Sequence, residues 1–448
     1  MKIKLISCTN KKPLELISFS ARVCYSSKKP KWGKLLDVEN ILWPAGHHTP
    51  FEHFFVSFLI EEIPVGEVTL GLHLIHPFYN TSQRSGRYSA KMFYQPNWRK
   101  IESYISNFWP EIRKEDRKEI MNYVKEGVSL FQENHFKITE LARKFLKKER
   151  PFISKENLER NAPKIAQEQL RMFIPVIFPT ALVYTINLVT LAALQRIAWT
   201  PIMREVVEEM IKAVLKKFPE LSFIYQWDKK NNQDWWPELK SKQIRILKEP
   251  RLKLLEIKKL SDAVFPSEEK ISPLDLLHFL PETMTNYFVR ITTQVEISLA
   301  TMGQDQRHRT LERSLPEFTG NFYLPPLLQE AGLEQKAKKI FQNWLSFKKK
   351  IPDTLWTILA PYGTMVRYKK TGSLNAIIHE QNKRLCWRAQ EEIYWLSCLL
   401  RKEIKKTKHK ELLKILEPPC FSGRKCPEGN QYCGRDLRKT KEFLRRKV

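Results

Sequence analysis

The order in which different types of segment follow one another repeats along this chain. Each half runs through a strand, a helix, a polar loop, basic helices and then apolar helices. Two halves of about 220 residues are far longer than the units of solenoid proteins, so the pattern indicates duplication of a whole domain. We therefore predict an α+β fold of two related domains, each with a small sheet flanked by helices.

Changes in composition predict where these domains begin and end. The first domain is expected over residues 1–225. Residues 226–262 combine tryptophans with a dense run of lysine and arginine, which indicates a linker region that contains a solvated helix. The second domain is expected over residues 263–417, and residues 418–448 form a short basic tail that contains cysteines.

Hydrophobic patterns predict the elements inside each domain. Strands are expected at residues 1–6, 54–60 and 287–293. The apolar stretch 172–194 is interrupted by prolines and polar residues, so it predicts a buried helix rather than a membrane span. Further helices are expected at residues 14–23, 115–149, 293–302, 354–368 and 374–400.

Charge and composition limit the kind of ligand. The formal net charge is +28, which favours anions such as nucleic acid, nucleotides or phosphorylated cofactors. There are only 14 glycines and neither a G-x-G-x-x-G nor a P-loop motif, so a dinucleotide fold built on a glycine-rich turn is not expected. Seven scattered cysteines and an N-terminus without a long apolar run predict a cytoplasmic protein without a signal peptide.

A basic triplet marks the middle of the second half. Arg307, His308 and Arg309 are consecutive, and Gln304 stands three residues before the first of them. If the helix predicted just before them continues, Gln304 and Arg307 share one face. A guanidinium group suits phosphate because its two N–H edges match two oxygens. Taken alone, the triplet is more typical of a solvated basic face.

The first half resembles the flavin-dependent thymidylate synthases (the ThyX family) at several places in the same order. Residues 46–53 are similar to the family's G-H-E-T-P-F-E-H segment, and residues 85–88, Ser-Gly-Arg-Tyr, match its nucleotide loop. Arg171 stands four residues before Pro175, as in the family, and Asn187 falls where the family has a flavin-contacting asparagine. The family's R-H-R triplet is missing here.

The second half carries what the first half lacks. Gln304 and residues 307–309 match the family's Q-x-x-R-H-R pattern, and Arg384 falls at its late arginine. In place of the Ser-Gly-Arg-Tyr loop, however, this half has residues 318–321, Phe-Thr-Gly-Asn. These complementary losses predict that the two halves contribute different parts of a shared site.

The resemblance implies an FAD-dependent thymidylate synthase, which converts dUMP to dTMP with methylenetetrahydrofolate and NADPH. In such an enzyme the flavin carries out the redox chemistry, and the protein supplies orientation and electrostatics. The resemblance assigns substrate binding to Ser85, Gly86, Arg87, Arg171, Gln304 and Arg384. It assigns catalysis to Ser85, Arg87 and Arg384. It assigns cofactor binding to His47, Thr49, Asn187, Arg307, His308 and Arg309. It also implies a homodimer that mimics the family's tetramer.

Other interpretations stay open. The chain could be a catalytically degenerate relative that binds nucleotide or nucleic acid through its basic runs, or an RNA-modifying flavoprotein. Locally, the histidines of residues 46–53 could cap a turn, and Asn187 could be a packing amide. Arg171 and Arg384 could pair with Glu168 and Glu391.

The tail places Cys420, Cys426 and Cys433 within fourteen residues. With His409 or Cys398 as a fourth ligand, these thiols could bind zinc or an iron–sulfur cluster. The spacing lacks the usual C-x-x-C pair, so we expect a flexible basic tail with incidental cysteines and no metal.

Overall fold

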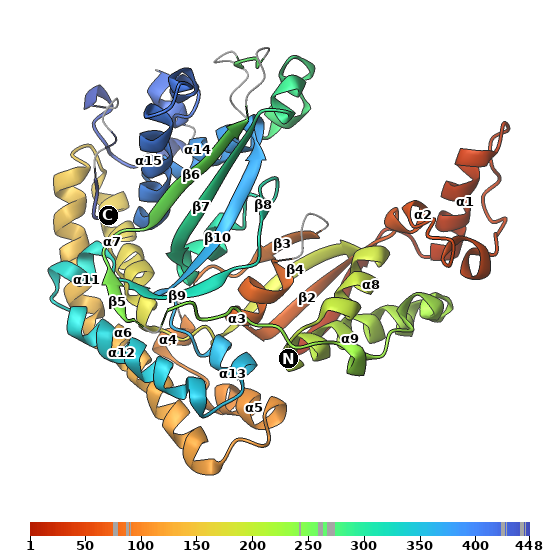
Figure 1. Ribbon diagram of the computed structural model, residues 1–448, viewed down its shortest axis with the longest axis horizontal. Helices are drawn as coiled ribbons and strands as arrows, with labels where there is room; N and C mark the ends of the chain where they lie inside the picture. The colour runs from red at the N-terminus through yellow and green to blue at the C-terminus, as the bar shows by residue number, and fades with distance from the viewer. Residues whose placement is uncertain are drawn as a thin grey trace.

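The computed structural model describes residues 1–74, 79–86, 89, 91–241, 243–258, 263–266, 274–422, 426, 428–439, 443 and 445–448. Two mainly antiparallel sheets lie near each other, and helices pack around both of them (Figure 1), which confirms the predicted α+β fold. Within the described residues, no helix has the length and apolar character needed to cross a membrane.

The first sheet has four strands in the order β1-β2-β4-β3, and all neighbours are antiparallel. Its strands are β1 (Lys2–Cys8), β2 (Phe55–Pro64), β3 (Tyr79–Gln83) and β4 (Pro179–Asn187). The predicted strands at 1–6 and 54–60 are therefore confirmed. β1 is an edge strand, which its alternation of exposed and half-buried residues fits.

The second sheet repeats this order. Its path is β6-β7-β10-β9, with β5 added parallel to β9 and β8 paired with β10. Its strands are β5 (Arg245–Leu247), β6 (Arg251–Lys258), β7 (Arg290–Ser298), β8 (Glu312–Arg313), β9 (Glu317–Tyr323) and β10 (Thr364–Ser373). The strand corresponding to β2 is β7, and the strand corresponding to β4 is β10.

Helices follow corresponding strands in both units. α3 (Val65–Glu67) follows β2 as α10 (Leu299–Asp305) follows β7. α8 (Leu188–Ile197) follows β4 as α14 (Leu374–Arg384) follows β10. A side-chain cap begins each of the latter two helices, from Asn187 in α8 and from Ser373 in α14.

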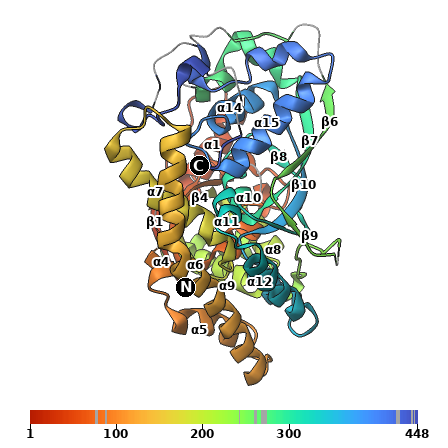
Figure 2. The same ribbon diagram turned by 90° about the vertical axis from the view of Figure 1, so that its left-hand side faces the viewer.

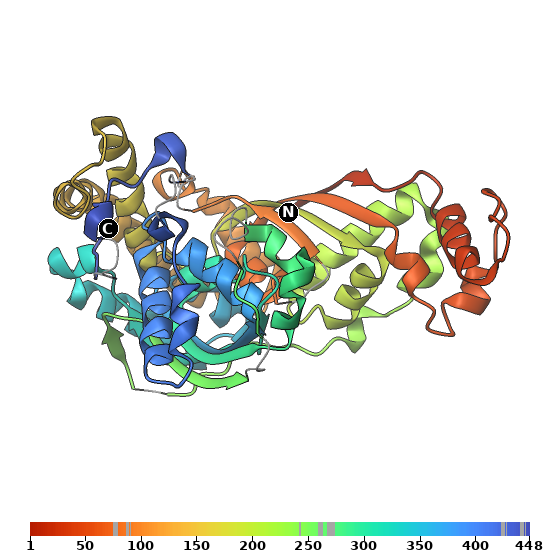
Figure 3. The same ribbon diagram turned by 90° about the horizontal axis from the view of Figure 1, so that it is seen from above.

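The remaining helices cover the sheets or extend from them. A long pair runs along one side of the molecule (Figure 2), formed by α6 (Lys114–Glu149) and α7 (Lys155–Leu170). In Figure 3, α1 (Pro13–Tyr25) and α2 (Thr49–Glu52) project away from the body at one end of β2. The others are α4 (Lys91–Tyr94), α5 (Trp98–Phe108), α9 (Pro201–Lys217), α11 (Pro326–Glu330), α12 (Glu334–Ser346), α13 (Asp353–Ile358) and α15 (Glu391–Lys405).

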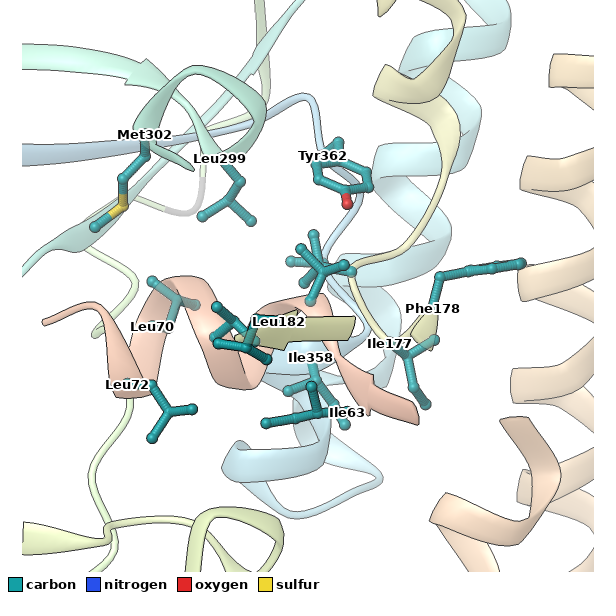
Figure 4. Packing of buried hydrophobic residues seen from close by; sticks show 14 of the residues in the cluster. Ile63, Leu70, Leu72, Ile177, Phe178, Leu182, Leu299, Met302, Ile358 and Tyr362 are labelled. Atoms are coloured by element: carbon teal, nitrogen blue, oxygen red, sulfur yellow. The ribbon is translucent and has the colours of Figure 1, made fainter. Parts of the chain in front are cut away.

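The two units meet through reciprocal backbone hydrogen bonds. The Val176 amide donates to the Ala360 carbonyl at 2.9 Å, and the Tyr362 amide donates to the Ile174 carbonyl at 2.9 Å. Corresponding segments just before β4 and β10 therefore pair with each other, as around a local two-fold axis. Side chains of both units pack together beside this junction (Figure 4), and one hydrophobic core cluster runs through both units.

A close approach of backbone to side chain tightens the same junction. A β-carbon on Gly66 in α3 would stand 3.0 Å from side-chain carbons of both Val176 and Ile358. The glycine therefore lets α3 pack directly against α13 of the other unit.

Several expected helices are strands. Residues 172–194 contain β4, where β-branched and aromatic residues such as Thr180, Tyr184 and Ile186 favour an extended chain. Residues 293–298 continue β7, so the helix expected at 293–302 begins only at Leu299. The helix expected at 354–368 ends at Ile358, and β10 follows it. Long apolar runs suit a buried central strand as well as a buried helix, and only pairing decides between them.

The basic linker is also extended rather than helical. The sequence Arg-Leu-Lys-Leu-Leu-Glu-Ile-Lys of β6 alternates apolar and charged residues, and it forms an exposed edge beside β7. Its lysines and arginine face solvent, which is a common way to keep an edge strand from pairing with other chains.

Candidate active site

A cavity of about 350 Å³ lies between the two units. The first unit contributes Ser85, Gly86 and Arg171 to its lining, and the second unit contributes Gln304, Arg307 and Arg384. The described residues that line it include four arginines, the fourth being Arg84, and no carboxylate. Such a lining attracts anions, because several guanidinium groups face one space.

The polar loop after β3 reaches this cavity beside Arg171. The Gly86 carbonyl accepts a hydrogen bond from Gln167 Nε2 at 2.9 Å. A β-carbon on Gly86 would stand 3.4 Å from Arg171 Nη1, so the glycine allows the loop to lie close to the guanidinium group. Arg87, expected in the same site, lies outside the described residues.

A buried amide joins the polar groups of the two units. Gln390 precedes α15 and is fully buried, and its Oε1 accepts a hydrogen bond from Arg171 Nη2 at 3.1 Å. The same oxygen accepts a second bond from Gln304 Nε2. Arg384 Nη2 donates to the Gln304 carbonyl at 2.6 Å. Gln390 therefore holds Arg171 and Gln304 in fixed relative positions.

Sequence reasoning missed the role of Gln390. The segment 389–393 resembles the family after its late arginine, which was the available signal, but no residue in it was singled out. The expected alternative partners of the arginines, Glu168 and Glu391, line a second, smaller cavity.

The three residues of the basic triplet point in different directions. Arg307 lines the cavity, where desolvation and the nearby Arg309 lower the pKa of its guanidinium group. Arg309 Nη1 donates to Asn80 Oδ1 at 2.7 Å and Nη2 donates to the Thr81 carbonyl at 2.9 Å, so it ties the triplet to β3 of the first unit. His308 is buried, and its ring packs edge-on against His379.

Electrostatics keep His308 neutral. Burial lowers the pKa of this imidazole well below its usual value, and the positive charge of Arg384 lowers it further. A neutral ring inside the second unit serves packing, so only Arg307 of the triplet is presented to the cavity.

A buried ion network fixes the turn that carries the triplet. Asp305, at the end of α10, accepts from Arg313 Nε at 2.6 Å, from Lys370 Nζ at 2.7 Å and from the Tyr368 hydroxyl at 2.8 Å. Although burial alone would raise it, these two cations hold the pKa of Asp305 well below its usual value. Lys370 also contacts Glu380 at 2.7 Å. The helix expected to continue to Arg307 therefore ends at Asp305, and the network keeps Gln304 and Arg307 beside the same cavity.

The other end of α10 is also held by a carboxyl group. Glu392 Oε1 accepts from the Ser298 amide at 2.7 Å, and its Oε2 accepts from the hydroxyls of Ser298 and Thr301. Burial raises the pKa of Glu392 to about 7 even though these hydrogen bonds oppose the rise. The contacts join α15 to the start of α10, next to the cavity-lining residues Leu299 and Ala300.

Three expected cofactor residues lie elsewhere. Asn187 ends β4 and caps α8 by accepting a hydrogen bond from the Thr190 amide at 2.7 Å. The cavity-lining Thr180 is at the opposite end of the same strand, seven residues or about 23 Å away. His47 and Thr49 belong to the part of the chain that projects with α2 (Figure 1). These three residues do not line the cavity.

The linker passes through the corresponding place on the other side of the junction. Leu70 and Ala198 stand where Gln304 and Arg384 stand in the second unit, after the corresponding strands and helices. The Trp199 indole donates to the Leu70 carbonyl at 3.2 Å, and the Trp235 amide of the linker donates to the Trp199 carbonyl at 3.1 Å. Asn232 Nδ2 donates to the Ala198 carbonyl at 3.2 Å.

The linker also covers β9, which replaces the polar loop. Leu239 pairs with Phe318, and β5 adds to the outer edge of β9. Gly320 has a φ of +78°, and a β-carbon there would stand 2.4 Å from the Ser241 carbonyl oxygen. The linker therefore occupies this region.

These features define a two-unit α+β protein with a cationic cavity that both units line. Residues 4–220 match the family model Thy1, described as "Thymidylate synthase complementing protein". This part of the chain therefore belongs to that family. No curated protein gives a match.

Solved structures give weaker likenesses. Two crystal structures of Thymidylate Synthase X from Helicobacter pylori with FAD and dUMP are 16% identical, with TM-scores of 0.33 and 0.32. Each covers 50% of this chain and 98% of its own. The UMP/dUMP methylase PolB from Streptomyces cacaoi, bound with 5-Br UMP, is 14% identical with a TM-score of 0.30, and covers 39% of this chain and 98% of its own. The family assignment rests on the match over residues 4–220 alone.

Proposed function

We propose that the chain is an FAD-dependent thymidylate synthase that methylates dUMP reductively to dTMP, with a site shared by its two halves. Methylenetetrahydrofolate supplies the one-carbon unit and NADPH the two electrons that reduce it to a methyl group, leaving tetrahydrofolate and NADP⁺. The observation that carries the proposal is the cavity in which Ser85 and Gly86 of the first unit meet Gln304, Arg307 and Arg384 of the second.

The donor set of the cavity fits a nucleotide and a flavin diphosphate. Its volume of about 350 Å³ lies at the lower end of the usual range for small-molecule sites. Ser85, Gly86, Arg87 and Arg171 would hold the phosphate of dUMP through charge-assisted hydrogen bonds. Arg307 would hold the FAD diphosphate. When bound, FAD supplies the hydride chemistry.

The remaining groups would act on the base. Gln304 and Arg384 are joined to each other and, through Gln390, to Arg171, so they form a rigid row beside the cavity. Donors fixed in this way stabilise negative charge on the uracil oxygens as the ring accepts carbon and hydride. Arg309 and His308 would support this row from behind rather than contact a ligand.

We further propose a homodimer in which His47, Thr49 and Asn187 complete a partner's cofactor site. They lie at the end of β2 and β4 that is remote from the cavity, next to the projecting α1. That projection exposes apolar side chains, including Tyr25 and Ile41, which a second copy would cover. The equal strand order of the two sheets supports duplication of one domain, so two chains would reproduce a four-domain assembly.

The basic surface supports a second candidate function. With a net charge of +28, a catalytically degenerate relative could bind nucleotide or nucleic acid electrostatically. The binding would then fall steeply with salt and need no flavin. The cytoplasmic location and the four sequence ranges proposed for domains, linker and tail stay predictions.

Rescue of a thymidine-requiring strain tests the proposal, together with purified variants. Ser85→Ala and Arg307→Ala should each abolish rescue, with Arg307→Ala also losing bound flavin absorbance. Arg99→Ala in α5 is the matched control, because this arginine is exposed and lies outside the cavity. Full dTMP formation by either cavity variant would refute the shared site. A colourless wild-type protein with salt-sensitive nucleic-acid binding would favour the second function.

A further inference from the structure

The tail packs against the body of the second unit instead of hanging free. The Arg435 guanidinium carbon lies 4.3 Å from the centre of the Trp387 ring and 5.0 Å from that of Phe421. Each of these residues neighbours a cysteine in sequence: Arg435 follows Cys433 by two residues, Trp387 follows Cys386, and Phe421 follows Cys420. Three cysteine-bearing segments therefore converge on one guanidinium group.

A second arginine brings the fourth segment to the same place. Arg388 Nη1 donates to the Gln431 carbonyl at 2.6 Å, and its Nε lies 3.4 Å from the carboxylate of Glu428. Glu428 is two residues after Cys426, whose carbonyl accepts from the Gly429 amide at 3.3 Å. Residues 386–388 are thus held beside Cys426 as well.

The thiols influence one another electrostatically. Burial raises the pKa of Cys386 to about 11, and Cys433 and Cys426 add to the rise. Burial raises the pKa of Cys420 to about 12, with further contributions from Cys386, Cys433 and Cys426. Cys398 lies in the same region, packed with Cys433 against one apolar cluster, and its thiol interacts with Tyr394 and nearby arginines. The contacts of Arg435 and Arg388 bring together the segments that carry Cys386 and the three tail cysteines, so we treat these four thiols as one group.

Buried cations surround this group of thiols. Arg150 is 5% exposed and Arg446 is 1% exposed. The Nε atom of each is buried without a hydrogen-bond partner. Arg446 Nη1 donates to the terminal Val448 oxygen at 2.5 Å, whereas among the described residues Arg150 forms no ion pair with a carboxylate. Arg150 Nη2 donates to the Trp387 carbonyl at 2.9 Å, next to Cys386. Buried guanidinium groups of this kind need nearby negative charge, because burying them uncompensated costs several kcal/mol each.

We propose that Cys386, Cys420, Cys426 and Cys433 form a four-thiolate metal centre. Metal binding releases the four thiol protons, and the resulting negative charge compensates the buried arginines. As they stand, no three His, Cys, Asp or Glu side chains in the described ranges are grouped closely enough to hold a metal. The four thiols must therefore move closer together when the metal binds. Four cysteines suit both tetrahedral zinc and a [4Fe–4S] cluster.

The centre would also secure the site described above. Cys386 stands two residues after Arg384 and four residues before Gln390, and both of these residues contact Gln304. Anchoring the turn between α14 and α15 to the tail would fix the positions of both side chains. The four cysteines would then be positioning residues for the cavity, and the metal would have no contact with the substrate.

Metal and sulfide analysis of the full-length protein, purified without oxygen, tests the proposal. About four iron and four acid-labile sulfide per chain identify a cluster, whereas about one zinc identifies a mononuclear site, and either result supports a four-thiolate centre. Cys386→Ser should lose at least half of the metal. Cys398→Ser, a half-buried neighbour outside the group, should keep it. Wild-type protein with no stoichiometric metal, or Cys386→Ser with wild-type metal content, overturns the proposal.

Thiol labelling keeps the test independent of variant folding. In native wild-type protein the four cysteines should resist iodoacetamide, while the exposed Cys24 reacts. Removal of the metal with a chelator should make all four reactive, as read by peptide mass spectrometry. If the four cysteines label equally with and without chelator, the proposal is wrong.

Discussion

Replacing Gln390 by leucine should lower both the free energy of unfolding and the catalytic rate. The side chain is fully buried, and its Oε1 accepts one hydrogen bond from a charged donor, Arg171, and one from the neutral Gln304 amide. A hydrogen bond to a charged group contributes about 1.5–3 kcal/mol and a neutral one about 0.5–1.5 kcal/mol. Leucine has a similar volume and accepts neither bond, so the free energy of unfolding should fall by about 2–4 kcal/mol.

The catalytic effect follows from lost positioning. Without the shared acceptor, Arg171 and Gln304 are no longer fixed relative to each other. If half of the lost stabilisation is realised in the transition state, kcat/KM for dUMP should fall roughly 5- to 30-fold. Urea denaturation followed by fluorescence, and dTMP formation, measure the two effects on the same preparations.

Two further variants sharpen the Gln390 experiment. Gln390→Glu keeps an acceptor for both donors and should recover most of the lost stability. Gln95→Leu removes an exposed glutamine amide and serves as the control. A Gln390→Leu protein that loses less than about 0.5 kcal/mol and keeps full activity would refute the bridging role.

Two further predictions concern pH and the linker. Because burial raises the pKa of Glu392 from 4.5 to about 7, the folded protein holds this proton more tightly than the unfolded chain, and stability should fall by about 3 kcal/mol between those pH values. Glu392→Gln should flatten this part of a denaturation-against-pH curve, and an unchanged slope would contradict the assignment. Gly320→Ala should destabilise more than Gly332→Ala, because both glycines have positive φ but only at Gly320 would a β-carbon collide with the linker. Equal losses in thermal unfolding would mean that the linker moves aside freely.

Local sequence pattern predicted part of the fold well. Alternation at residues 1–6 and the run of β-forming residues at 54–60 identified β1 and β2, since burial alternates along both strands. The central strand β4 carries an apolar residue, Val183, on its less buried face, and further apolar residues flank the strand on both sides. The run 172–194 therefore lacks a clear period of two and resembles a buried helix.

In the site, too, local motifs identified some residues, whereas the residues that support them depend on contacts between distant segments. Motif resemblance selected Ser85, Arg171, Gln304 and Arg384, which the fold brings to one cavity from widely separated positions. Nothing in the local sequence marks Asp305 as a support, because its partners come from β8 and β10, two strands that only folding places beside it. His308 lies in the same motif as Arg307, yet the backbone turn after α10 sends its ring into the core.

The linker makes the two units unequal, because it packs over only one side of their junction. The linker hydrogen-bonds to the residues around Leu70 and Ala198 and extends the sheet through β5. It therefore covers this region permanently as well as connecting the two units. Replacing the linker with a flexible glycine–serine segment would expose an apolar surface where the two units meet. Such a protein should aggregate rather than gain a second active site.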